Sequence, residues 1–323
     1  MKRWINCMLV VLMMAASAWA GSQPFTPPPN RNAALRYWMA FADLQDHPAD
    51  QATTALMEQV LEGSANWDEQ RLGPIVEANS AAVLSMQRGS ELPECNWGLD
   101  YSRGEAMSLG HLPKARVLAR LNALYGARQI AQGDTAGAVA TWLAGLRFAQ
   151  CVSKGVGLIG ILSAKPAFMA NLHLITRAAQ SGLTGELQRQ VTAQLRKLPA
   201  DGLDWASSIR AEAWADQQSL RNLATSTNFQ QTYKDFYGTP APEAAHPPTA
   251  GEIEAFAALM NEIVAAFQLS HEQAEEKLKS LMARADQMNP AVRSVIPGYL
   301  KMNDNREQVV REQQGLLKVL KSK

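Results

Sequence analysis

The sequence has few of the residues from which metal and redox centres are built. Its 323 residues include three cysteines and five histidines, and neither a Cys-x-x-Cys pair nor a His-Glu-x-x-His sequence occurs. These absences exclude a thioredoxin-type motif, a zinc ribbon and a zinc-peptidase helix. The histidines stand singly in the chain, at His47, His111, His173, His246 and His271. We therefore expect no metal site.

Motifs of other enzyme classes are also missing. The chain has no Gly-x-Ser-x-Gly nucleophile elbow and no Gly-x-x-x-x-Gly-Lys-Ser/Thr phosphate loop. A Gly-x-Gly-x-x-Gly string does occur at Gly155–Gly160, but it follows a helical pattern, whereas a dinucleotide site follows a strand. We expect this string to be a turn between two packed helices. The sequence thus predicts no cofactor, shows no identifiable catalytic machinery and favours a non-enzymatic protein, with an enzyme as the alternative.

Neither sign of charge is in large excess. The chain has 31 Lys and Arg against 30 Asp and Glu, and removal of Lys2 and Arg3 with a cleaved leader would leave one more acidic than basic residue. A nearly neutral chain gives no electrostatic reason to expect nucleic acid or an anionic membrane as a partner. The hydrophobic content of 47% is sufficient for a substantial core.

The first twenty residues have the layout of a bacterial secretory signal peptide. A basic start precedes the apolar segment Ile5–Ala15, and Ala18-Trp19-Ala20 supplies small residues before Gly21. The apolar run is shorter than the roughly 20 residues of a membrane span. Cys7 precedes the apolar segment, so no cysteine is placed for lipidation after cleavage. We expect cleavage near Ala20–Gly21, export to the periplasm or medium, and no stable membrane anchor.

The remaining chain is rich in helix-forming residues and nearly lacks alternating β-branched runs, which predicts an all-α fold of packed antiparallel helical hairpins. The first expected helix, Asn32 to Leu44, has Leu35, Trp38, Met39 and Phe41 at helical spacing. The predicted organisation is a signal peptide (1–20), a Pro-rich segment (21–31), a helical domain (32–238), a Pro-rich connector (239–251) and C-terminal helices packed on the main domain (252–323).

The clearest unit is a helical hairpin formed by Lys114 to Ala131 and Thr135 to Val152. Gly133 suits the left-handed residue after the first helix, and Asp134 or Thr135 suits the N-cap of the second. Trp142 is expected to be buried between the helices and their neighbours. Small residues would let the two helices approach closely: Gly126, Ala127, Ala131, Ala138 and Gly145.

The segment Ala127–Ala138, followed by Ala144-Gly145-Leu146, resembles the core of a tetratricopeptide repeat, with small residues and Gly-Asp at the turn. The resemblance covers one hairpin, and no second good copy follows at the family's period of about 34 residues. A generic α-hairpin with a favourable turn is the alternative. The run from Cys95-Asn96-Trp97-Gly98 into this hairpin is also similar to exported helical bacterial proteins to which no activity is attached.

Two segments carry candidate functional residues. The loop 94–111 gathers polar side chains of the kind that line sites on loops: Asp100, Arg103, Glu105 and His111. The alternative is a loop that covers the core, with Trp97 and Tyr101 as packing anchors. An aromatic stripe at helical spacing, formed by Phe229, Tyr233, Phe236 and Tyr237, suits a protein or peptide partner. The alternative there is a short helix that buries its aromatic rings in the main body.

The two cysteines that follow the signal peptide are predicted to form a disulfide. Cys95 precedes the hairpin, and Cys151 lies in the last turn of its second helix. Because the first helix runs back along the second, the loop before Pro113 lies on the correct side to reach Cys151. Two separate buried thiols are the alternative.

The inventory as a whole predicts an exported helical binding or scaffold protein of unidentified ligand. The alternative is a hydrolase-like enzyme with its polar site in the 94–111 loop. Concave helical surfaces serve binding well, and no residue pattern in the chain demands catalysis.

Export is directly testable because the cleavage position is defined. Mass spectrometry of the extracytoplasmic fraction should find a chain that begins at Gly21, since the small residues before it meet the requirement of the signal peptidase. An intact N-terminus retained in the cytoplasm would contradict the export prediction.

Overall fold

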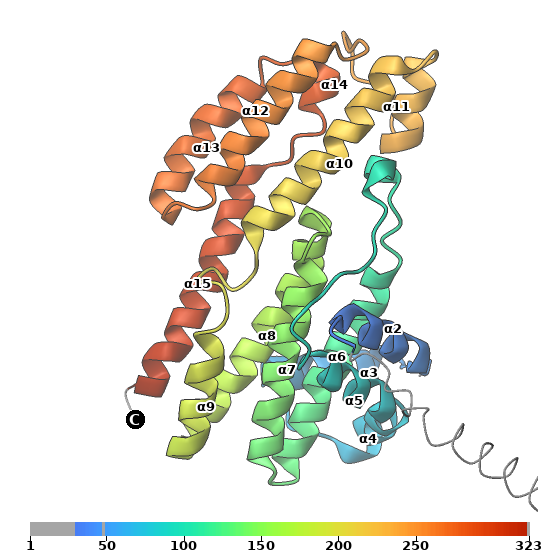
Figure 1. Cartoon of the computed structure of the whole chain (residues 1–323). Helices are drawn as coiled ribbons and strands as arrows, with labels where there is room; N and C mark the ends of the chain where they lie inside the picture. Colours follow the sequence, from blue (N-terminus) through green and yellow to red (C-terminus); the bar gives the residue numbers. More distant parts are fainter. Residues whose placement is uncertain (1–29, 47–48, 322–323) are drawn as a thin grey trace, which may run out of the picture. The chain divides into compact units, whose positions relative to one another are not determined.

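The computed structural model describes residues 30–46 and 49–321, so the expected signal peptide and most of the Pro-rich segment lie outside the described residues. Residues from Asn32 onward form one compact unit. The secondary structure of the described residues consists of helices without any strand, which confirms the predicted all-α class (Figure 1). The helices are α2 (Ala33–Asp43), α3 (Gln51–Glu62), α4 (Glu69–Ala78), α5 (Ser80–Gly89), α6 (His111–Ala131), α7 (Thr135–Ser153), α8 (Leu158–Gly182), α9 (Gly185–Leu195), α10 (Trp205–Thr225), α11 (Phe229–Tyr237), α12 (Ala250–Ala266), α13 (His271–Ala285), α14 (Pro290–Arg293) and α15 (Tyr299–Lys321), with a 3₁₀ segment η1 (Tyr101–Ala106).

The α6–α7 hairpin is present, and its turn has the expected chemistry. Gly133 has φ of +83°, and the Asp134 carboxylate accepts a hydrogen bond from the Gly137 amide at 2.8 Å. Trp142 is 2% exposed, and its indole N–H donates to the carbonyl of Ala123 on α6 at 3.1 Å. A side chain at Gly126 would collide with this indole ring, so glycine there permits the close approach.

Gly145 has a different role from the one expected. A side chain at Gly145 would meet Asn171 of α8 rather than a residue of α6. Helix α7 packs against both α6 and α8 (Figure 1). Some small residues of α7 therefore face α6 and others face α8. The sequence pattern of the α6–α7 hairpin alone does not show which helix each of them faces.

Helix α8 follows a glycine turn, as expected for the Gly155–Gly160 string. Gly155 and Gly157 have φ of +70° and +74°, and the Glu212 carboxylate of α10 accepts a hydrogen bond from the Leu158 amide at 3.0 Å. Among the described helices, α8 alone is long and apolar enough to cross a membrane. However, 61% of its apolar window is buried inside the protein, as in a core helix.

The orientation of α2 differs from the expectation. Tyr37 and Phe41 are buried, whereas Leu35, Trp38 and Met39 are 54%, 43% and 52% exposed. Helix α2 has apolar side chains on most of its faces, so the helical spacing of its apolar residues does not show which face is buried. The small residues Ala33, Ala34 and Ala40 are all fully buried, and they let α2 lie close to its neighbours.

Residues 69–89 form two helices, α4 and α5, which meet at Asn79. The side-chain NH2 of Asn79 donates to the Ile75 carbonyl at 3.0 Å, and its side-chain oxygen accepts from the backbone N–H of Gln45 at 2.9 Å. Asparagine side chains compete in this way with the backbone hydrogen bonds of a helix. The break is therefore local chemistry that the apolar spacing does not reveal.

The last helix, α15, begins at Tyr299, directly after Pro297-Gly298. Arg306 itself is 4% exposed. Its guanidinium donates to the carbonyls of Phe267 and Leu269, the latter at 2.9 Å, and lies 5.3 Å from the Phe267 ring centre. Burial lowers the pKa of Arg306. The buried arginine thus joins α15 to the end of α12.

Replacing Arg306 by alanine should lower the free energy of unfolding by about 3 kcal/mol, because two buried carbonyls lose a charged donor. Arg311→Ala, which removes an arginine in an exposed pair with Glu307, should change it by less than about 0.5 kcal/mol. Urea unfolding of both variants measures the difference. Equal losses would show that the Arg306 contacts do not stabilise the fold.

Candidate ligand-binding site

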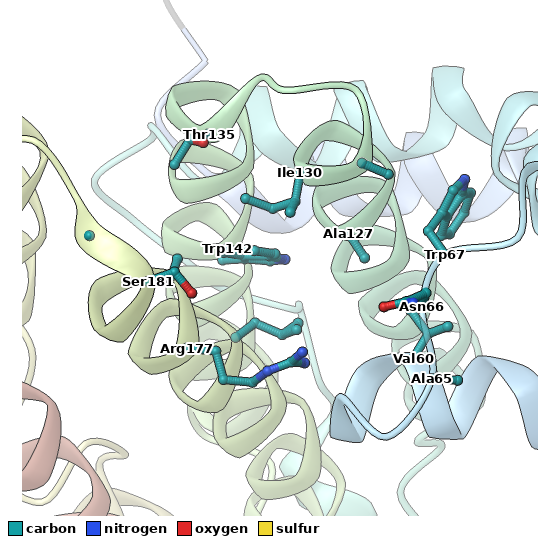
Figure 2. A pocket seen from close by; sticks show the side chains of 14 residues that line it. Val60, Ala65, Asn66, Trp67, Ala127, Ile130, Thr135, Trp142, Arg177 and Ser181 are labelled. Atoms are coloured by element: carbon teal, nitrogen blue, oxygen red, sulfur yellow. The ribbon is translucent and has the colours of Figure 1, made fainter.

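A cleft of about 510 Å³ opens between the α3–α4 turn, α6, α7 and α8. Ligand pockets in proteins typically have volumes of about 300–1,000 Å³. Figure 2 shows side chains from all these segments directed around one hollow. Four segments distant in sequence therefore build the site, which explains why no local motif indicates it.

Much of the cleft lining is apolar. It includes Trp142, Ile130, Leu174 and Val60, which come from different sides of the hollow (Figure 2). The Trp142 ring cannot rotate freely, because its N–H donates a hydrogen bond to Ala123 of α6 and the nitrogen side of the indole lies against Gly126. Ile130, by contrast, is 39% exposed. A preformed apolar surface of this kind suits the hydrocarbon part of a ligand.

Arg177 is the one charged side chain among the residues that line the cleft. It extends from α8 toward the α3–α4 turn, with Trp142 above it in the view of Figure 2. The Arg177 side chain forms no hydrogen bond or ion pair with any described residue. Its positive charge is thus available to a ligand.

The position of the Arg177 guanidinium depends on Gly63, the C-cap residue of α3. A side chain at Gly63 would collide with the guanidinium. Gly63 has φ of +82°, and its amide donates to the carbonyls of Gln59 and Val60 at the end of α3. A helix C-terminus attracts cations through its partial negative charge. Glycine therefore provides both the turn and the space for the arginine.

A second arginine near the cleft shows the contrast. Arg128 of α6 binds Glu69 and Glu77, each at 2.6 Å, and the Arg128 hydrogen bond lowers the pKa of the Glu69 carboxyl. Glu69 also accepts from the indole N–H of Trp67 at 2.6 Å, which fixes Trp67 at the cleft edge. The charge of Arg128 is thus neutralised within the protein, whereas that of Arg177 is not.

In the 94–111 loop, the described candidate side chains are those of Asp100, Arg103 and His111, and they form no polar contact with one another. Asp100 is exposed, and its carboxylate accepts from the amide and hydroxyl of Ser102 at 3.2 and 2.6 Å. Arg103 is exposed, and the side chain of Glu105 lies outside the described residues. The Arg103 amide donates to the Asp100 backbone carbonyl at 3.3 Å. No side-chain hydrogen bond or ion pair within the described part of the chain joins Asp100, Arg103 and His111. The contacts that acid–base catalysis would need are therefore not formed among these three.

His111 lies in an aromatic cluster instead. It is 1% exposed, and its ring stacks on Trp97 with centroids 4.4 Å apart. Its Nε2 has no hydrogen-bond partner among the described residues, and burial lowers its pKa to about 4. Trp97 is buried, and the Tyr101 hydroxyl donates to the Gly155 carbonyl at 2.5 Å. Trp97 and Tyr101 thus anchor the loop to the rest of the fold, as in the alternative in which the loop covers the core.

The aromatic residues of α11 face inward to different degrees. Tyr233 is 3% exposed, and its hydroxyl donates to Ser294 at 2.6 Å. Phe229, Phe236 and Tyr237 are half-buried and pack against the core. Their contacts are used within the fold, so the stripe presents no continuous open aromatic surface.

Cys95 and Cys151 are close to each other and are both thiols in the structure. The Cys95 thiol donates to the backbone carbonyl of Cys151, with sulfur and oxygen 3.8 Å apart. The loop therefore approaches the end of α7 on the side that the hairpin geometry indicates. The described residues contain no group of three or more His, Cys, Asp or Glu that would hold a metal ion.

No family model, no curated protein and no solved structure matches this chain. The functional interpretation consequently depends on the geometry of the sites themselves.

The buried His111 predicts a pH-dependent stability. The unfolded chain takes up the imidazole proton near pH 6.5, and the folded protein does so near pH 4. Between these values the unfolded state binds more protons, so the folded protein loses stability, by about 3 kcal/mol, as the pH falls from 6.5 to 4. Urea unfolding at several pH values measures the slope of the unfolding free energy against pH, and this slope should be smaller in His111→Gln than in the wild type.

The exposed histidine His173 is the matched control. His173→Gln should leave the pH slope as in the wild type, because that ring is open to solvent beside Glu312. The His111 assignment fails if both variants retain the full slope.

Proposed function

We propose that this chain is an exported helical binding protein whose ligand site is the cleft formed by α3, α6, α7 and α8. The observation that carries the proposal is the combination of an apolar lining with the unpaired guanidinium of Arg177 in a cleft of about 510 Å³. Arg177 is exposed to solvent, so its guanidinium can exchange water for the anionic group of a ligand that enters the cleft. The cleft has both features in one place.

The lining residues define the class of ligand. The single charge is positive, and no aspartate or glutamate lines the cleft. A small amphipathic anion, such as a medium-chain carboxylate, would place its chain against Trp142 and Ile130 and its carboxylate on Arg177. Arginine binds carboxylates through paired N–H donors. A peptide with a free C-terminal carboxylate presents the same chemistry on a larger partner.

The cleft favours binding over catalysis. Its lining includes no histidine, cysteine, lysine, aspartate or glutamate that would act as a general base. Its hydroxyl groups, Thr135 and Ser181, therefore have no base beside them in the cleft. The hydrolase alternative gains no support from this site.

Export is supported by the N-terminal sequence pattern, and the near-neutral charge supports a partner other than nucleic acid or an anionic membrane. The tetratricopeptide-like character of α6–α7 is supported by the Gly133-Asp134 turn and by the contact of Gly126 with Trp142. Helices of such repeats line concave binding surfaces. We extend that use to the α6–α7 side of the cleft.

The Cys95–Cys151 disulfide remains a prediction, supported by the proximity of the Cys95 sulfur to the Cys151 carbonyl. The two residues are 56 positions apart, and closing a loop of that size stabilises a fold by about 4 kcal/mol on the chain-entropy model. An oxidising compartment outside the cytoplasm would favour the bond.

Fluorescence titration with decanoate, read as displacement of 1-anilinonaphthalene-8-sulfonate, tests the ligand site. Both probes are amphipathic anions. Arg177→Gln should weaken decanoate binding about tenfold, because the ligand loses a charge-assisted hydrogen bond. Arg189→Gln, which removes an exposed charge on α9, should leave the affinity unchanged. Equal affinities of the wild type and Arg177→Gln would contradict the proposed site.

A pair of glycine variants separates the arginine position from backbone strain. Gly63→Ala and Gly133→Ala introduce a side chain at nearly the same φ, +82° and +83°, so each should cost about 1 kcal/mol of stability. A side chain at Gly63 displaces Arg177, whereas one at Gly133 meets no atom within 4 Å. Only Gly63→Ala should weaken decanoate binding, and an equal loss in both variants would assign the effect to strain.

A further inference from the structure

The two cysteines share a small hollow near the C-terminal end of α7. The hollow has a volume of about 210 Å³, and its lining includes Cys95, Cys151, Tyr37, Arg147 and Lys154. Both cysteines are half-buried. A small molecule in the hollow would thus contact both residues without an opening of the fold.

The residues around Cys95 are held firmly in place. Asn96 and Asn32 exchange two hydrogen bonds of 2.8 Å between side chain and backbone, and the Ala33 amide donates to the Glu94 carbonyl at 2.7 Å. The Trp97 indole donates to the Cys151 carbonyl at 2.7 Å, the same carbonyl that the Cys95 thiol approaches. The loop therefore presents Cys95 to Cys151 in a defined position.

The charged groups around the hollow favour a thiolate. Arg147 and Lys154 supply two positive charges, and Glu94 supplies one negative charge. The neighbouring Cys95 thiol, together with the charge of Lys154, lowers the pKa of Cys151. The hydrogen bond to Cys151, together with burial, raises the pKa of Cys95. The two thiols thus differ in character, as they do in pairs that exchange disulfides in a fixed order.

We propose that Cys151 and Cys95 form a thiol–disulfide exchange site, in which Cys151 attacks an external low-molecular-weight disulfide and Cys95 resolves the mixed disulfide. This proposal extends the expected Cys95–Cys151 bond by giving it an order of formation and a co-reactant. It is independent of ligand binding in the α3–α8 cleft, which is lined by other residues.

The exchange balances in two steps. The Cys151 thiolate forms a bond to one sulfur of the external disulfide, whose sulfur–sulfur bond breaks and releases one thiolate. Cys95 then loses its proton to solvent and attacks the Cys151 sulfur, which releases the second thiolate. The protein is oxidised by two electrons, and the external disulfide is reduced to two thiols.

Oxidised glutathione is the probe for this exchange. The chain would carry Cys7→Ser, so that Cys95 and Cys151 are its two thiols. After reduction and removal of the reductant, this protein should form the internal disulfide, detected by mass and by loss of both maleimide-reactive thiols. Cys95→Ser should accumulate a glutathione adduct on Cys151, and Cys151→Ser should form its adduct on Cys95 about tenfold more slowly.

A charge variant and a labelling experiment complete the test. Lys154→Gln should slow the reaction of Cys151 several-fold, whereas Lys234→Gln, on α11, should not. Where a serine variant fails to fold, a brief pulse of limiting iodoacetamide on the reduced protein with both cysteines replaces it. Peptide mapping should find Cys151 labelled first.

The proposal is overturned by any of three results. These are two free thiols retained in excess oxidised glutathione, equal adduct rates for the two serine variants, or first labelling at Cys95. A protein that does not bind decanoate but exchanges disulfides normally would contradict the proposed ligand site and leave the exchange proposal intact.

Discussion

The fold depends on the burial of helix α7, which is apolar on every face. Six consecutive residues, Thr141–Leu146, are buried, and six residues of an α-helix point in all directions around its axis. Such a helix is stable in water only when other elements surround it. Helices α5, α6, α8 and α9 contact α7 within the described residues. The remaining helices are then arranged on this central group, with α10 and α15 packed against α8.

Each half of α7 contributes residues to one of the two proposed sites. Thr135 and Trp142, in its first half, line the cleft, and Arg147 and Cys151, in its second half, line the thiol hollow. Because α7 is fixed from all sides, side chains at its ends are held in defined positions. A rigid central element with functional groups at its margins is a common way to obtain preformed sites.

The sequence predicts what depends on local chemistry. The hairpin and the Gly133-Asp134 turn follow from residue type and spacing, and the structure contains them. The buried face of α2 and the role of Gly145 depend on which neighbours pack there, and one sequence does not define those neighbours. The cleft requires four segments to meet, and no local pattern in the sequence indicated Arg177. The 94–111 loop attracted attention through its polar composition, but Trp97 and Tyr101 anchor it to the core.

Hydrogen exchange of the purified protein, followed by mass spectrometry with and without decanoate, tests the account most directly. The amides of α7 should exchange most slowly in both states, because their opening requires the surrounding helices to separate. Decanoate should add protection in residues 60–67 and 177–182, which form the sides of the cleft around Arg177. Fast exchange throughout α7, or decanoate protection confined to other helices, would contradict the account.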